Sequence, residues 1–243
     1  MAEKKAVNKV VEPTNEEIDA KVDQLVAKAQ VALSKFENFT QEQVDYIVAK
    51  CSVAGLDAHG TLAEAAVNET GRGVFEDKAV KNLFACEYVT SNLRHLKTVG
   101  IINEDPLLGI TEIAEPVGVV CGIVPTTNPT STVIFKSLIC LKTRNPIIFS
   151  FHPSAHACSV MAAVVIRDAA VAAGAPEDCI QWLDVKSMYA TTALMKHPGV
   201  ATILATGGNA MVAAAYSCGK PALGVGAGNV PAYVEKTCVL PRA

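Results

Sequence analysis

The chain has 243 residues and a net charge of −3; half of its residues are hydrophobic and only 5% are aromatic. This length can bury a sizeable core, and the charge gives no electrostatic basis for binding nucleic acid or an anionic membrane. No apolar run approaches the roughly 20 residues that span a bilayer, and the N-terminus lacks the apolar segment of a signal peptide, so we expect a cytoplasmic protein.

The cysteines predict no metal site. They stand at positions 51, 86, 121, 140, 158, 179, 218 and 238, without a C-x-x-C pair or a histidine at metal-ligand spacing. We therefore expect reduced thiols, which is typical of a cytoplasmic chain. Cys121 and Cys140 lie inside apolar runs and are predicted to be small core residues.

The first 97 residues predict helices. Residues 1–13 are expected to be a disordered arm, and residues 14–97 a solvated helical layer. Capping boxes begin at Thr14, Thr40 and Thr61 and predict three helix N-termini. A fourth helix is predicted from Glu76 to about Lys97. Its apolar residues are expected to face the core: Val80, Leu83, Phe84 and Tyr88.

Residues 98–116 change to a strand-like pattern. Two short apolar runs, at 100–102 and 109–114, flank a turn-rich segment that contains Asn-Glu-Asp-Pro. Exposed strands tend to find a partner. We therefore predict a projecting β-hairpin through which the chain forms a homodimer or a higher assembly.

The segment from Val117 to Phe151 reads as strand, loop, helix and strand. Its first apolar run ends at Pro125, and Pro129 suits the first position of a helix, with Asn128 as a good N-cap. The second strand is predicted at 147–151. The cations of the helix are expected to face solvent or a ligand: Lys136, Lys142 and Arg144.

The α/β alternation continues to the end of the chain. Ser154 is predicted to cap a helix that ends at Gly174, and further helices are predicted at 187–196 and 207–217. The predicted strands are 180–184, 200–205, 222–225 and 232–234. The pattern predicts an α/β fold with a doubly wound, mostly parallel sheet.

Three loops follow predicted strands: 125–129, 150–153 and 206–208. In a doubly wound sheet the carboxyl ends of the strands meet at one edge, so a nucleotide lying across these loops is plausible. The usual dinucleotide fingerprint is absent. The G-x-G-x-G run at 224–228 precedes a strand and does not stand between strand and helix.

Four motifs, VPTTNPTS, SFHP, ILATGG and GVGAGN, carry a resemblance in their order and separation. Together they resemble the CoA-acylating branch of the aldehyde dehydrogenase superfamily, and most closely the N-terminal part of its bifunctional aldehyde–alcohol dehydrogenases. The similarity runs from Phe39 nearly to the end of the chain. It implies an aldehyde dehydrogenase-type Rossmann variant, with residues 117–243 as the dinucleotide-binding domain and 14–97 as its helical layer.

The resemblance implies roles for particular residues. Asn128 matches the amide that stabilises the oxyanion, although a role as helix cap alone remains open. His152 could touch NAD or coenzyme A. The cofactor-binding positions that the resemblance implies are Ile123, Val124, Pro125, Thr126, Thr127, Asn128, Ser150, His152, Pro153, Thr206, Gly207, Gly208 and Gly226.

Two departures from the hydrolytic aldehyde dehydrogenases shape the expected function. Val225 stands where those enzymes carry a glutamate base, which favours attack by the thiol of CoA over attack by water: aldehyde + CoA + NAD⁺ ⇌ acyl-CoA + NADH. The resemblance also implies that the nucleophilic cysteine, the rest of the catalytic domain and an iron-dependent alcohol dehydrogenase half lie beyond Ala243. We therefore expect a truncated chain that is inactive alone and holds no metal itself.

Two alternatives remain open. The chain could be a stand-alone nucleotide-binding or assembly module that associates through the 98–116 hairpin. It could also be a shortened enzyme that uses Cys218 as its nucleophile, although a packed residue near the end of a helix explains this cysteine more simply.

Overall fold

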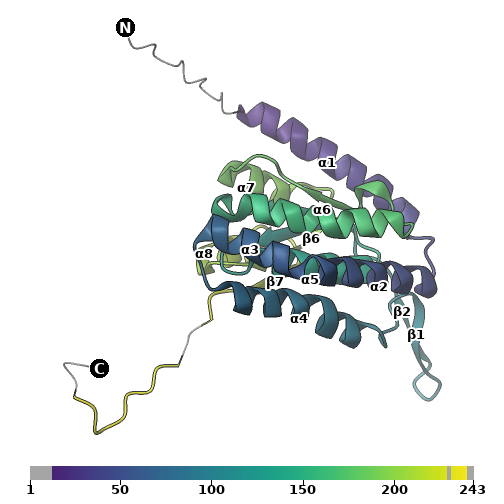
Figure 1. The fold of residues 1–243 in the computed structure, drawn as a ribbon. Coiled ribbons are helices and arrows are strands. Elements are labelled where there is room, and N and C mark those ends of the chain that lie inside the picture. The colour runs from purple at the N-terminus through teal and green to yellow at the C-terminus, as the bar shows by residue number, and fades with distance from the viewer. Residues whose placement is uncertain (1–12, 229–230, 240–243) are drawn as a thin grey trace.

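A parallel sheet forms the centre of the protein. The structure, a computed structural model, describes residues 13–228 and 231–239. Within these residues the main sheet has five strands in the order β5-β4-β3-β6-β7, and every pairing in it is parallel (Figure 1). The strands are β3 (Val119–Val124), β4 (Ile147–Phe151), β5 (Ile180–Trp182), β6 (Val200–Thr206) and β7 (Ala222–Val225). The central strands β3 and β4 are buried throughout, as their unbroken apolar runs predict.

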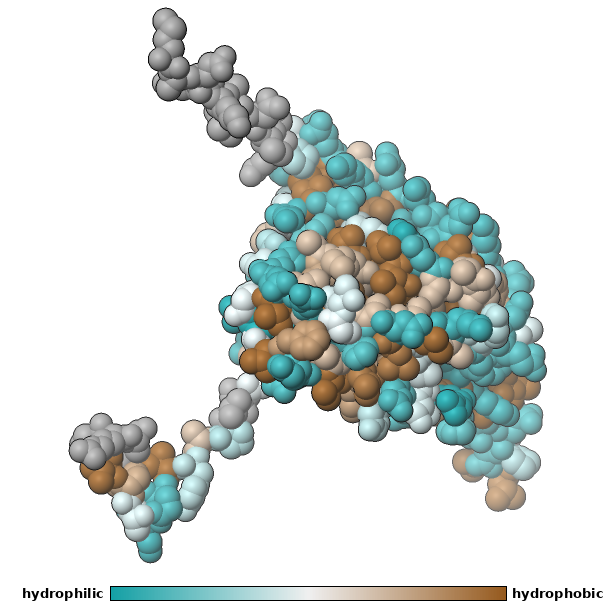
Figure 2. Space-filling model, in the orientation of Figure 1, coloured by the Kyte–Doolittle hydropathy of each residue, from teal (hydrophilic) through white to brown (hydrophobic). Residues whose placement is uncertain are grey.

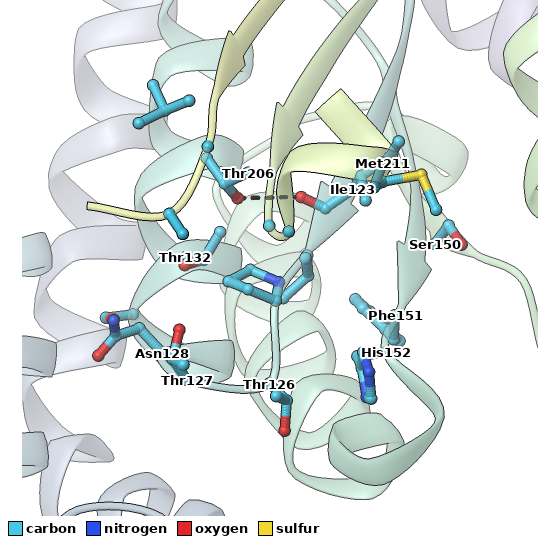
Figure 3. Close-up of a pocket in the computed structure, with 18 of the residues that line it drawn as sticks. Ile123, Thr126, Thr127, Asn128, Thr132, Ser150, Phe151, His152, Thr206 and Met211 are labelled. Carbon is cyan, nitrogen blue, oxygen red and sulfur yellow. Dashed lines mark hydrogen bonds between the residues drawn. The ribbon is translucent and has the colours of Figure 1, made fainter. Parts of the chain in front are cut away.

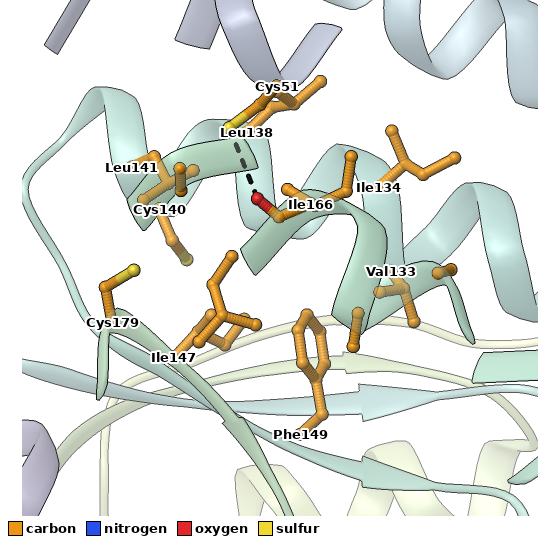
Figure 4. Packing of buried hydrophobic residues seen from close by; sticks show 14 of the residues in the cluster. Cys51, Val133, Ile134, Leu138, Cys140, Leu141, Ile147, Phe149, Ile166 and Cys179 are labelled. Carbon is orange, nitrogen blue, oxygen red and sulfur yellow. Dashed lines mark hydrogen bonds between the residues drawn. The ribbon is translucent and has the colours of Figure 1, made fainter. Parts of the chain in front are cut away.

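Helices cover both faces of this sheet, so the doubly wound α/β fold is confirmed. One buried cluster joins the sheet to α2 (Gln41–Asp57), α3 (His59–Thr70), α4 (Phe75–Leu93), α5 (Pro129–Lys142) and α6 (His156–Ala172), and Figure 4 shows part of it. The other cluster joins the opposite face to α1 (Asn15–Phe36), α7 (Met188–Lys196) and α8 (Asn209–Tyr216). Cys121 and Cys140 are buried in these clusters, as predicted.

The N-terminal helices differ from the prediction in two ways. α1 packs on the opposite face of the sheet from α2, α3 and α4, so the four helices do not form one layer. Both hydrogen bonds of the capping box are present at Thr14 and at Thr40, but Thr61 lies inside α3 and is not its N-cap. α3 instead begins at His59, directly after the end of α2, and Ala58 serves as the junction of the two helices.

The predicted core face of α4 was wrong. Val80, Phe84 and Tyr88 are exposed, and the rings of the two aromatic residues stack on each other with 5.4 Å between their centroids. The buried residues of this helix are Lys78, Asn82, Ala85 and Cys86. The physical reason is that polar groups of the loop between β3 and α5, and of the first turn of α5, lie beneath α4, so the inward face of the helix is partly polar.

The predicted exposure of the cations in and after α5 was also wrong, because each of them reaches an acceptor from a distant segment. Lys136 donates to two main-chain oxygens of the sheet. Lys142 pairs with Asp45 of α2. Arg144 donates to the oxygen of Ala114 at 2.9 Å, at the base of the hairpin. Buried cations are tolerated only with such partners.

The predicted hairpin is present. β1 (Gly100–Asp105) and β2 (Ile110–Ala114) pair antiparallel and project from the body of the molecule (Figure 1). Leu107, at the tip, is 96% exposed, and apolar colour gathers at the tip in Figure 2. The use of this hairpin in assembly stays a prediction.

The C-terminal elements need smaller corrections. Ser154 lies in a short 3₁₀ turn and caps no α-helix; α6 begins at His156, and the carboxylate of Glu69 accepts hydrogen bonds from its first turn. Ser187 caps α7 as predicted. The predicted strand at 232–234 is irregular chain. The predicted arm, residues 1–13, falls outside the described residues except for Pro13.

One helical stretch, Pro153–Ala172, is long enough and apolar enough to cross a membrane. No segment of this kind was predicted from the sequence. Its apolar side, including Cys158, Ala162 and Ile166, is buried within the protein. This is the packing of a core helix.

Candidate functional site

A cavity of about 940 Å³ lies at the carboxyl edge of the sheet. The loops after β3, β4 and β6 line it, together with the chain that follows β7 (Figure 3). All thirteen positions predicted for the cofactor lie in its wall. Parallel strands explain this convergence, because their carboxyl ends meet at one edge. β3 and β6 are adjacent, and the chain leaves them in opposite directions, so the cavity lies at the switch point of the topology.

Hydrogen bonds from two side chains link the carboxyl ends of β3 and β6. The main-chain oxygen of Ile123 accepts from Thr206 Oγ1 at 3.1 Å and from Lys136 Nζ at 2.6 Å. The same ammonium donates to the oxygen of Leu204 at 2.6 Å. Burial lowers the pKa of Lys136 to about 7. The floor of the cavity is therefore held by a buried lysine that the sequence pattern assigned to solvent or ligand.

Asn128 stands at the N-cap position of α5, and Pro129 occupies the first turn as predicted. The Asn128 side chain makes no cap hydrogen bond, however, so the prediction of a good N-cap was wrong. Only its main-chain oxygen takes part in the helix, accepting from Thr132 N at 3.2 Å. The amide of Asn128 lines the cavity and is not engaged in capping (Figure 3).

The loop after β4 presents two polar groups. Ser150 is buried, and its hydroxyl is hydrogen-bonded to that of Thr191 at 2.7 Å. His152 Nδ1 accepts from Ser154 N at 3.2 Å. Because Nδ1 accepts this bond, Nε2 is the ring nitrogen that can act as a donor.

The N-terminus of α8 opens onto the cavity. Gly208 is its N-cap, and no side chain caps the helix there. A Cβ placed on Gly207 or Gly208 would meet no atom within 4 Å, so the space in front of this helix end is open. Gly226 has a different reason to be glycine, because its Cβ would collide with Asn209 Oδ1, which accepts from Ala227 N at 3.0 Å.

The charge of the cavity is low. Among the lining residues that the structure describes, Lys81 carries the only full charge, and no carboxylate is present. Val225 lies in the wall and is 68% exposed. In the described part of the chain, no three His, Cys, Asp or Glu residues come together to hold a metal ion. The site therefore offers backbone N–H groups, hydroxyls and one amide, and no described group that could serve as a carboxylate base.

No cysteine of the described residues lines this cavity. Cys218 Sγ donates to the main-chain oxygen of Ala215 at 3.0 Å, at the end of α8. The alternative of a shortened enzyme with Cys218 as nucleophile therefore finds no support in the geometry.

Sequence reasoning missed Lys78, Asn82 and Lys136, which hold the loop and the floor of the site. One signal was available. One face of the helix carries Lys78, Asn82 and Ala85, which recur at helical spacing. This face lies next to the apolar one that was predicted to face the core. The local sequence pattern gives no reason to expect the polar face to be buried in place of the apolar one.

The fold and the cavity define a doubly wound α/β domain with a cleft at its switch point, the class that includes the dinucleotide-binding domains. The model of the aldehyde dehydrogenase family matches residues 3–237. The chain belongs to this family.

Among curated proteins, aldehyde-alcohol dehydrogenase 2 of Entamoeba histolytica is 70% identical over 228 residues, which are 93% of this chain and 26% of that protein. The chain thus spans about a quarter of the length of such relatives. Among solved structures, an acetylating aldehyde dehydrogenase from Geobacillus thermoglucosidasius has a TM-score of 0.88 and 48% identity, over 91% of this chain and 49% of that one. A Rhodopseudomonas palustris propionaldehyde dehydrogenase with bound CoA and an acylated cysteine has a TM-score of 0.74 and 33% identity, over 86% and 47%.

Proposed function

We propose that the chain is the cofactor-binding portion of an NAD-dependent, CoA-acylating acetaldehyde dehydrogenase that works reversibly in ethanol fermentation. One observation carries the proposal: three loops at strand ends line a single cavity, and the Asn128 amide in its wall is not engaged in capping. The family of the chain supports the reaction class, and the related propionaldehyde dehydrogenase holds CoA. The expected substrates are an aldehyde and coenzyme A.

The residues of the cavity fit a dinucleotide. The open, uncapped N-terminus of α8 at Gly207 and Gly208 would hold the diphosphate, because helix N-termini bind anions through free N–H groups. The Ile123–Asn128 loop would pass under the nicotinamide ribose, with Ser150, His152 and Pro153 on the adenosine side. The cavity volume lies in the usual range for ligands, roughly 300–1,000 Å³. A bound NAD⁺ would supply the hydride acceptor.

Asn128 would donate its amide N–H to the oxygen of the aldehyde as that oxygen becomes negatively charged. A donor of this kind is worth roughly 3 kcal/mol in the transition state. Capping and catalysis do not compete for this amide here, because the side chain makes no cap hydrogen bond.

The choice of thiol over water follows from the charge of the wall. With Val225 in place of a carboxylate, the lining residues that are described offer no base to activate water. The thiol of CoA is the stronger nucleophile near neutral pH and needs less assistance. We infer transfer of the acyl group to CoA.

Three further features complete the proposal. We expect the protein in the cytoplasm, and iron only in the alcohol dehydrogenase part of the bifunctional relatives. We also expect a homodimer or higher assembly through the hairpin, whose exposed Leu107, Leu108 and Ile113 favour association.

Calorimetric titration of the chain with NADH tests the cofactor assignment, and saturable binding at one site is expected. A full-length protein that carries this chain should oxidise NADH with acetyl-CoA. Absence of binding at millimolar NADH would contradict the cofactor site. NADH binding without turnover in the full-length protein would favour the second candidate, a nucleotide-binding assembly module, which the exposed hairpin tip supports.

A further inference from the structure

Two polar side chains of α4, Lys78 and Asn82, are buried next to the loop that carries Asn128. Lys78 is 7% exposed and Asn82 is 1% exposed. They stand one turn apart on the same face of the helix. Burying an ammonium and an amide is costly unless each finds a hydrogen-bond partner, so their partners show what the two side chains hold in place.

The partners lie on either side of Asn128 in the sequence. Lys78 Nζ donates to the main-chain oxygen of Thr127 at 2.8 Å. Asn82 Oδ1 accepts from Thr130 Oγ1 at 2.8 Å, and its Nδ2 donates to the main-chain oxygen of His59 at 2.9 Å. The residue before Asn128 and the second residue after it are therefore both tied to α4, and Asn82 is in turn tied to α3.

Lys78 makes its hydrogen bond to the Thr127 oxygen without also forming an ion pair. Within the described residues, no carboxylate lies at ion-pair distance from its ammonium. Burial lowers the pKa of Lys78. The turn before α4 lies over the side chain, since a Cβ on Gly73 would stand 3.4 Å from Lys78 Cε. The lysine is thus confined, and its hydrogen bond to the Thr127 oxygen is its specific contact.

We propose that Lys78 and Asn82 are positioning residues that hold the chain on both sides of Asn128, at the main-chain oxygen of Thr127 and at the side-chain hydroxyl of Thr130, and thereby fix the direction of the Asn128 amide. The inference rests on the proposed role of Asn128 as oxyanion donor. That amide gains no orientation from capping α5, so its direction depends on the loop that carries it. A displacement of about 1 Å at a reacting centre can cost a factor of 10² in rate.

The test uses a full-length protein that carries this chain, with three measurements: kcat for acetyl-CoA reduction, Kd for NADH and the midpoint of thermal unfolding. Lys78→Met should lower kcat by about 10- to 100-fold and leave Kd within about twofold. Lys78→Arg should restore part of the loss. Lys50→Met, at an exposed position of α2, is the matched control and should leave kcat unchanged.

Thr130→Val provides an independent variant, because it removes only the hydroxyl that Asn82 holds and keeps the shape of the side chain. It should lower kcat in the same direction even if Lys78→Met folds poorly. Unchanged kcat in both variants, or a fall that merely follows the loss of folded protein, would overturn the inference.

A double-mutant cycle separates positioning from a general structural effect. If Lys78 acts through Asn128, Lys78→Met should add no further loss of kcat in an Asn128→Ala background. Additive losses would show that Lys78 acts independently of Asn128 and would overturn the inference. If Asn128→Ala alone leaves kcat unchanged, the proposed role of Asn128 is what fails, and the inference falls with it.

Discussion

Lys136 Nζ lies 2.6 Å from the main-chain oxygen of Ile123, at the end of β3, and donates also to Leu204 of β6 at the same distance. One buried ammonium thus joins the two strands at the point where their connections diverge. The two strands also pair through their main chains up to Ile123 and Ala205, and beyond that point the switch of connections leaves a crevice between the strand ends. The crevice is where the candidate cofactor loops meet.

Lys136→Met should remove a pH dependence of stability. The pKa of Lys136 is about 7 in the folded chain, against roughly 10.4 in an unfolded one. Between about pH 7 and pH 10 the unfolded chain therefore binds a proton that the folded chain does not, and stability rises with pH by at most about 1.4 kcal/mol per unit. Urea unfolding at pH 7, 8 and 9 should show that the free energy of unfolding of the wild type increases with pH relative to that of the variant. A constant difference would contradict the assignment.

Glu69→Gln should destabilise the chain by about 1 kcal/mol at pH 7, because the carboxylate caps α6 through the N–H groups of Ala157 and Cys158. Burial by itself raises the pKa of Glu69, but the hydrogen bonds from Cys158 and Ala157, together with the charge of Lys186, leave the pKa lowered. The contribution is therefore complete above the ordinary pKa of about 4.3 and is lost as the pH falls further. Denaturant unfolding should show the difference shrinking below about pH 4. Glu64→Gln, an exposed position on the same helix, is the control.

Gly208→Val should weaken NADH binding by more than about tenfold without destabilising the fold. The backbone at Gly208 is extended, which valine adopts readily, and the space before it is open. The new side chain would occupy the position proposed for the diphosphate. Calorimetry on the isolated chain measures the effect, and Ala214→Val, on an exposed position of α8, is the control. Equal affinities in wild type and the Gly208 variant would show that the diphosphate does not bind there.

Asn128→Asp should separate catalysis from stability in a full-length protein. Because the wild-type side chain makes no cap bond, both Asn128→Asp and Asn128→Ala should stay within about 0.5 kcal/mol of wild type. Both should lower the acylation rate by roughly 10²-fold, since neither an ionised carboxylate nor a methyl group can donate to an oxyanion. Stopped-flow NADH absorbance and thermal unfolding measure the two effects. Near-normal turnover in a variant that melts earlier would identify Asn128 as a cap only.

The sequence determined the sheet and the edge where the site forms. Unbroken apolar runs marked β3 and β4 as strands buried on both faces, and Pro125 and Pro129 marked where strand and helix meet. Because parallel strands must end at one edge, loops far apart in the chain were predicted to meet, and they line one cavity. These features depend on local patterns and on a topological rule, both of which a sequence carries.

Only the tertiary structure decided where the long polar side chains go. Lys78, Lys136 and Arg144 are buried because main-chain oxygens from other segments come within their reach, and local periodicity does not encode those oxygens. The cap of α6 likewise comes from Glu69, on a helix almost ninety residues earlier in the sequence. Hydrophobic patterns report the average face of a helix, but a hydrogen bond to a distant carbonyl can outweigh the preference of one side chain for water.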